Sequence, residues 1–193
     1  MKRSIQAFFC IALSLAAVSA HAQVVPAATG NSFYVNAGGL GSGFQPDYAN
    51  TGVAQNSPNR LYGIGAYADA HFTRLVQIEG EARWSRFNES YVCGLVNGQN
   101  LYCQNGENTY SIGPRIAPYT FHKFTPYGKV LVGIGSGSFL TGRCFVLAYG
   151  GGVDYRLTRR FTLRAFDFEF QQWHVTPTLH PYGGSVGLSY RVF

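Results

Sequence analysis

Charged side chains occupy every second position in several segments of this chain, and their chemistry depends on where that alternation places them. Between Val76 and Trp84, the residues Glu79, Glu81 and Arg83 share one parity, while the other parity is apolar or small. Successive side chains of a strand point to opposite faces, so these charges would lie together on one face. Charges on an enclosed face can conduct ions or can pair into a salt-bridge network. The same parity argument assigns twelve residues to this inner face: Asp69, Glu79, Glu81, Arg83, Arg115, Lys129, Asp154, Arg156, Arg164, Asp167, Glu169 and Arg191.

The balance of these charges favours pairing over conduction. Six of the twelve residues are acidic and six are basic. Ion-selective pores carry an excess of one sign, whereas unpaired charges in a narrow interior are costly. We therefore predict a structural charge network, with a small, narrow channel as the alternative.

The residues that could support catalysis or metal binding do not form a complete site. Asp69 and His71 share a face, but no serine lies at a matching strand position. The segment His174-Val175-Thr176 is similar to the nucleophile–base pair of a lipid-modifying barrel enzyme only with threonine in place of serine, and no carboxylate follows it. His174 and His180 are fewer than the three or four ligands of a zinc site. We therefore predict no enzyme, no metal and no cofactor, and a lipid-modifying enzyme is the less favoured alternative.

The elements that would position these residues are strands. Apolar residues alternate with polar ones in segments of about ten residues separated by turn residues, which is typical of transmembrane barrels with an apolar outer face and a polar lumen. No stretch after the N-terminus approaches the roughly 18 apolar residues of a transmembrane helix. The predicted fold is an all-β, eight-stranded, antiparallel, up-and-down transmembrane β-barrel. Its strands are expected near 31–44, 60–71, 75–87, 109–119, 124–137, 144–157, 161–173 and 183–193.

The connections alternate in length. Those at 45–59, 88–108, 138–143 and 174–182 are long or rich in Gly, Pro and Asn, and those at 72–74, 120–123 and 158–160 are tight. In outer-membrane barrels long loops are extracellular and short turns periplasmic. We therefore expect the long loops outside the cell and both termini in the periplasm.

Two strands allow finer predictions. In the strand near 124–137, Val130 is expected to face lipid and Lys129 the lumen, so that Val130→Arg would destabilise the barrel more than Lys129→Gln. In the strand near 161–173, Arg164 and Asp167 can both face inward only if one extra residue is inserted. A β-bulge is predicted at Ala165-Phe166. Aromatic residues near strand ends are expected to form two interfacial girdles: Phe33, Tyr62, Phe72, Trp84, Phe87, Tyr110, Tyr119, Phe145, Tyr155, Phe161, Trp173 and Tyr190.

The N-terminal segment has the pattern of a secretory signal. Lys2 and Arg3 precede an apolar run, and the small-x-small site ends at Ala22 before Gln23. The predicted domains are a cleaved signal peptide at 1–22 and a barrel at 23–193. Removal of Lys2 and Arg3 from the 15 basic residues leaves 13, against 9 acidic ones, and this small, dispersed excess predicts no nucleic-acid partner.

The remaining cysteines are Cys93, Cys103 and Cys144. Export to an oxidising compartment favours a disulfide between Cys93 and Cys103, which would leave Cys144 free. Three thiols allow three pairings, so the alternatives remain open.

Several short segments resemble one membrane-protein family. They are Gly113-Pro114-Arg115, residues 124–127 (Phe-Thr-Pro-Tyr), the glycine-rich segment 150–155, and the last strand, 187–193, which ends on an aromatic residue. Together they look like the small outer-membrane β-barrel family that includes the membrane domain of OmpA and the Opa-like proteins. The resemblance implies a monomeric integral protein of the bacterial outer membrane with a structural, envelope-integrity or surface-interaction role. It also implies contact with outer-membrane lipids, folding by the barrel-assembly machinery through Tyr190 and Phe193 as the assembly signal, and an extracellular ligand bound through surface loops.

Overall fold

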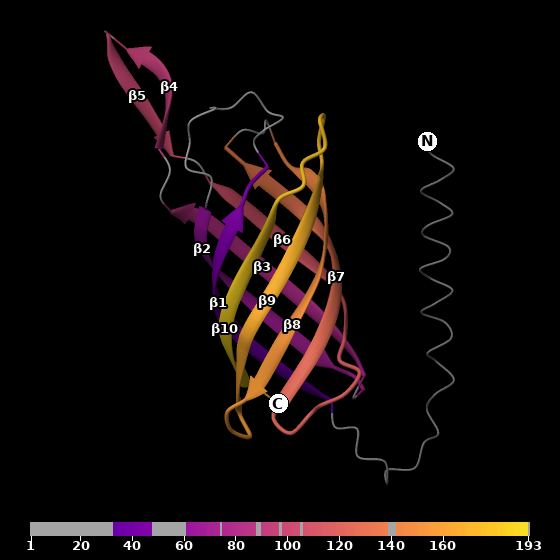
Figure 1. The fold of residues 1–193 in the computed structure, drawn as a ribbon. Helices are drawn as coiled ribbons and strands as arrows, with labels where there is room; N and C mark the ends of the chain where they lie inside the picture. The colour runs from indigo at the N-terminus through magenta and orange to yellow at the C-terminus, as the bar shows by residue number, and fades with distance from the viewer. Residues whose placement is uncertain are drawn as a thin grey trace, which may run out of the picture. The chain divides into compact units, whose positions relative to one another are not determined.

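The chain folds into a closed antiparallel barrel of eight strands (Figure 1). The computed structural model describes residues 33–47, 61–73, 75–87, 90–96, 98–104, 106–138 and 142–192. The barrel strands are β1 (Tyr34–Gln45), β2 (Leu61–His71), β3 (Val76–Phe87), β6 (Glu107–Ile116), β7 (Phe124–Gly137), β8 (Cys144–Arg156), β9 (Phe161–His174) and β10 (Tyr182–Arg191). The predicted all-β, eight-stranded barrel is confirmed. No helix in the described ranges has the length and apolar character needed to cross a membrane.

Each barrel strand pairs with the barrel strand before it and with the one after it, so that β3 pairs with β6, and β1 closes the ring by pairing with β10. Asn36 lies opposite Arg191, and this register continues to Gln45 opposite Tyr182. Closure leaves no unpaired strand edge, which a barrel exposed to lipid requires. We call the end with the tight connections β2–β3, β6–β7 and β8–β9 the short-turn end, and the opposite end the long-loop end.

One predicted loop contains regular structure. Within 88–108, β4 (Ser90–Val96) and β5 (Gln99–Gln104) form a separate two-stranded antiparallel sheet. The sequence carries a signal for this hairpin, because Asn97-Gly98 is a favoured two-residue turn and Gly98 adopts a positive φ of 78°. The sequence prediction treated the segment as a loop because it contains many Gly, Asn and Gln residues.

The predicted bulge in β9 is confirmed. Val153 pairs with Phe166 and Asp154 pairs with Arg164, so Ala165 is the inserted residue. Arg164 and Asp167 are both fully buried as a result, while Ala165 and Phe166 are exposed on the outer face. The insertion keeps an arginine out of the lipid, where it would cost about 2–4 kcal/mol at mid-depth.

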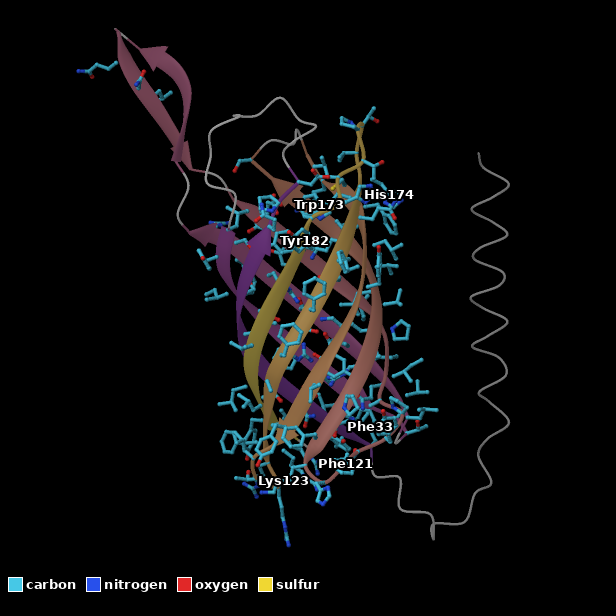
Figure 2. The ribbon with its side chains drawn as sticks, in the orientation of Figure 1. Phe33, Phe121, Lys123, Trp173, His174 and Tyr182 are labelled. Carbon is cyan, nitrogen blue, oxygen red and sulfur yellow. The ribbon has the colours of Figure 1, made fainter. Side chains whose placement is uncertain are left out.

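The outer face is apolar and has aromatic side chains toward both ends. Figure 2 shows Phe33 and Phe121 near one end and Tyr182 near the other. Phe33, Tyr119, Phe121, Tyr62 and Tyr182 are all exposed, as interfacial girdles require. Trp173 was wrongly placed in a girdle, because its side chain is only 1% exposed and packs inside the long-loop end. The side chain of Phe87 lies outside the described part of the chain.

Candidate functional site

Lys129 lies at the centre of the barrel interior. Residues Tyr127, Lys129 and Leu131 of β7 are buried and Val130 is exposed, as the alternation predicts. The Nζ atom of Lys129 lies 3.1 Å from Glu79, 3.0 Å from Glu81, 2.8 Å from Asp167 and 3.0 Å from Glu169. Strands β3 and β9, which supply these carboxylates, are not neighbours in the barrel. The ammonium group therefore connects separate parts of the wall through the lumen.

Two arginines form the layer nearer the short-turn end. Arg164 contacts Glu79 at 2.8 Å and Asp69 at 3.4 Å, and its guanidinium carbon lies 3.8 Å from the centroid of the Tyr67 ring. Arg115 contacts Asp69 at 2.8 Å and also pairs with Asp154. The guanidinium of Arg115 stacks on Tyr127, with 3.6 Å to the ring centroid. These aromatic rings supply cation–π contacts that lower the cost of burying the guanidinium groups.

Arg83 forms the layer nearer the long-loop end. It pairs with Glu81 and lies 3.2 Å from Asp167 and 3.3 Å from Glu169. A chain of hydrogen bonds continues from Glu169 toward the long-loop end. Glu169 accepts from Gln171 at 2.7 Å, and Gln171 accepts from the indole N–H of Trp173 at 2.8 Å. Side-chain hydrogen bonds therefore extend from the charged layers to Trp173 near the long-loop end of the barrel.

An apolar cap lies between the ion-pair layers and the long-loop end of the barrel. Val146, Trp173 and Leu179 form one buried cluster. Leu179 reaches Trp173 because the β9–β10 connection folds back, with backbone hydrogen bonds between these two residues at 2.9 and 3.2 Å. Gly135 leaves room for the indole, since a Cβ there would lie 3.0 Å from the Trp173 ring and 2.8 Å from Val146. Sequence reasoning missed the cap because it assigned Trp173 by its place near a strand end.

Ten of the twelve residues expected inside form a single ion-pair network. Arg156 and Arg191 lie outside it, because β8 and β10 end there: Arg156 is exposed and Arg191 is half-buried against Tyr34 at the short-turn end. The network thus contains six carboxylates and four cations, which is not the equal count of the sequence prediction. The strand alternation also places Tyr127 and Gln171 on the inner face, although the sequence prediction did not include them in the network. It missed Tyr67 and Ser185, which have the same inward parity. Ser185 donates to Asp167 at 3.2 Å, and Tyr127 donates to the same carboxylate at 2.9 Å.

Three of the carboxylates have the spacing of a metal site. Ligand oxygens of Glu81, Asp167 and Glu169 lie within 4.8 Å of one another. The Lys129 ammonium contacts all three, and Arg83 contacts all three as well. Side-chain cations of the protein therefore supply the positive charge that such a cluster attracts.

The residues considered for catalysis and metal binding make separate contacts. Asp69 pairs with Arg115 and Arg164, whereas the Nε2 atom of His71 lies 3.0 Å from the amide nitrogen of Asn36. His174 is exposed and packs edge-on against Phe145. The backbone N–H of His180 donates to Asp47 at 3.1 Å. None of these contacts brings a nucleophile, a base and an orienting acid together within the described residues.

The remaining predicted residues are placed only in part. The thiol of Cys144 is free and donates to the carbonyl of Gly135 at 3.6 Å. Tyr190 faces outward, packs against Phe161 and accepts from Arg160 at 3.1 Å. Ala22, Gln23 and Phe193 lie outside the described residues, as do the side chains of Cys93 and Cys103.

Comparisons with known proteins agree with this architecture. The family model described as "Outer membrane protein beta-barrel domain" matches residues 8–191. Neisserial surface protein A is similar in structure, with a TM-score of 0.53, 13% identity, and coverage of 82% of this chain and 96% of that one. OprG of Pseudomonas aeruginosa has a TM-score of 0.52, 10% identity, and coverage of 83% and 96%. Ail of Yersinia pestis, in complex with the heparin analogue sucrose octasulfate, has a TM-score of 0.50, 16% identity, and coverage of 82% and 97%. A search of curated protein sequences found no match.

Proposed function

Because the chain belongs to the outer membrane protein beta-barrel domain family, we propose that it is a closed, non-conducting barrel that acts as a structural and surface-contact protein of the outer membrane. The long loops then face the cell exterior, and the short turns and both termini face the periplasm, as is usual for such barrels. The protein acts as a monomer, contacts outer-membrane lipids through its apolar wall and has no catalytic role. Cleavage between Ala22 and Gln23 and folding by the barrel-assembly machinery belong to the same proposal.

The filled lumen carries this proposal. Glu79 and Arg164 are fully buried, and the side chain of Lys129 is equally inaccessible. Charged side chains from β2, β3, β6, β7, β8 and β9 meet there. An interior of eight strands is just wide enough for side chains to fill. Ions therefore have no open path through this layer unless the network rearranges.

Planar-bilayer conductance of the purified protein tests the closed state. The unmodified barrel should conduct weakly or not at all. Arg83→Ser combined with Arg115→Ser should raise the conductance, because each substitution shortens a side chain that crosses the lumen and leaves carboxylates unpaired. Arg143→Ser combined with Arg159→Ser is the matched control, since it removes the same charge outside the network. Large, stable, ion-selective openings of the unmodified protein would show that the channel alternative is correct.

The composition of the long connections supports the surface-contact role and indicates the kind of partner. Residues 46–60, 88–106, 138–143 and 175–181 contain two arginines, one aspartate and one glutamate, so their formal net charge is zero. They are rich in Asn and Gly and include Tyr48, Tyr91, Tyr102 and Phe139. Uncharged polar and aromatic residues suit contact with another protein. A sulfated sugar such as the one bound by Ail would favour a basic surface.

Surface contact can be tested with cells that display the barrel. Replacement of residues 90–104 by a Gly-Ser segment of equal length should reduce adhesion to protein-coated surfaces, while adhesion to heparin-coated surfaces stays at the level of cells without the barrel. Gly41→Ala, on the outer wall of β1, is the control for expression and folding. Strong heparin binding by the unmodified barrel would contradict the assignment of a protein partner.

A further inference from the structure

A cavity of about 510 Å³ opens at the short-turn end of the barrel. Its walls include Tyr34 of β1, Gln77 of β3, Asp154 and Arg156 of β8, and Arg191 of β10. The exposed connection through Tyr119 borders its mouth. The cavity lies on the short-turn side of the ion-pair network, and the two have only Arg115 and Asp154 in common. Its size falls in the range of small-molecule sites, about 300–1,000 Å³.

The charge of this cavity differs from that of the network above it. Three arginines and one carboxylate line it: Arg115, Arg156, Arg191 and Asp154. Asp154 is already paired with Arg115. Neither Arg156 nor Arg191 belongs to any ion pair among the described residues. Two guanidinium groups without an ion-pair partner among the described residues therefore lie in the wall of this open cavity.

The walls hold one of these groups, the guanidinium of Arg191, in position. The Arg191 guanidinium lies 3.9 Å from the centroid of the Tyr34 ring, and Tyr34 stacks in turn on His71 at 4.0 Å. Asn36 holds His71 through the contact at 3.0 Å. Guanidinium groups stacked on aromatic rings are preorganised for bidentate recognition of phosphate or carboxylate.

Unused hydrogen-bonding groups provide an independent sign of a ligand. Among the described residues, the Nε atoms of Arg115 and Arg191 are buried donors without a hydrogen-bond partner, and Oε1 of Gln77 and Oδ1 of Asp154 are buried acceptors without one. All four atoms belong to residues that line the cavity. Buried polar groups nearly always have a partner. An oxyanion in the cavity could accept from the Nε atoms of Arg115 and Arg191, and a hydroxyl of the same ligand could donate to Gln77 or Asp154.

We propose that this cavity binds a small soluble organic oxyanion, carrying a phosphate or carboxylate group, through Arg156 and Arg191. The cavity lies inside the barrel, at the short-turn end of the lumen, and not on the lipid-facing outer wall. The ligand therefore enters from the aqueous phase at the short-turn end and not from the bilayer. Tyr119, which is exposed beside the cavity, provides the surface for the body of the ligand. This site is separate from the surface-contact role of the long loops.

Nuclear magnetic resonance of the refolded full-length barrel in maltoside micelles tests the proposal at constant ionic strength. Inorganic phosphate and acetate are the soluble probes, short-chain phosphatidylglycerol is the lipid probe, and glucose is the neutral control. The Nε–H signals of Arg115 and Arg191 should shift saturably with phosphate or acetate and not with glucose. Arg156→Gln and Arg191→Gln should each weaken binding about tenfold, as the loss of one charge-assisted contact implies.

Arg159→Gln is the matched control, since it removes the same charge from the β8–β9 turn outside the cavity. It should leave binding unchanged. If Arg159→Gln weakened binding as much as Arg156→Gln and Arg191→Gln, or if the shifts never saturated, binding would reflect the general surface charge of the protein. Either result would overturn the proposal. Binding of the lipid probe alone would overturn the soluble ligand. Arg156→Gln keeps the test decisive if Arg191→Gln, in the last strand, fails to refold.

Discussion

The two ends of the barrel interior are built in opposite ways. At the long-loop end Val146, Trp173 and Leu179 pack into an apolar cap. At the short-turn end the interior opens into a cavity with two arginines that have no ion-pair partner in the described chain. The ion-pair network separates the two. The difference teaches that the lumen is closed twice, once by ion pairs and once by apolar packing, and that the 510 Å³ cavity at the short-turn end offers space for a solute.

Lys129→Gln should have the largest effect on stability. It removes the cation that contacts four carboxylates, and breaking buried ion pairs costs about 3–5 kcal/mol. Val130→Arg, at the next position on the lipid face, should cost about 2–4 kcal/mol. The structure thus reverses the order expected from sequence alone. Urea unfolding in lipid vesicles, followed by tryptophan fluorescence, measures both, and a smaller effect for Lys129→Gln would show that water or protons relieve the network.

Removal of the apolar cap should lower stability by a similar amount without opening the barrel. Trp173→Ala leaves a cavity in a packed cluster, which costs about 3–5 kcal/mol. The network below still blocks the lumen, so the single variant should not conduct. Added to Arg83→Ser and Arg115→Ser, it should increase conductance beyond that of the double variant. Conductance from Trp173→Ala alone would mean that the cap is the main barrier.

Gly135→Val tests how tightly the cap is packed. The added side chain meets Trp173 and Val146 at 3.0 Å or less, and overpacking of this kind costs about 1–3 kcal/mol. Gly41→Ala is the control, because a Cβ there meets nothing within 4 Å. Unfolding of both variants in vesicles gives the comparison. Equal stability of the two variants would show that the indole moves aside freely.

The sequence predicted the barrel well because strand parity is a local property. The alternation around Lys129 and Val130 fixed which side chain faces lipid, and the mismatch between Arg164 and Asp167 located the bulge. The partners of Lys129 were beyond reach, because β3, β7 and β9 meet only across the closed lumen. Trp173 was misplaced for a similar reason, since its burial depends on the distant Leu179 and Val146.

The disulfide prediction concerns a region separate from both ends of the lumen, and its effect on barrel stability should be the smallest. In the β4–β5 sheet, Tyr91 lies opposite Cys103, and the register shift between Val92 and Gly94 makes Cys93 the inserted residue. Both cysteines therefore lie on adjacent paired strands, as a Cys93–Cys103 bond would require. Peptide mapping without reduction should recover these two residues in one crosslinked species, and Cys144→Ser should not change it.

Because β4 and β5 pair only with each other in the described chain, reduction should leave the unfolding of the barrel in vesicles nearly unchanged. A main crosslinked species containing Cys144 would contradict the pairing, and a large loss of barrel stability on reduction would show that the hairpin supports the barrel wall.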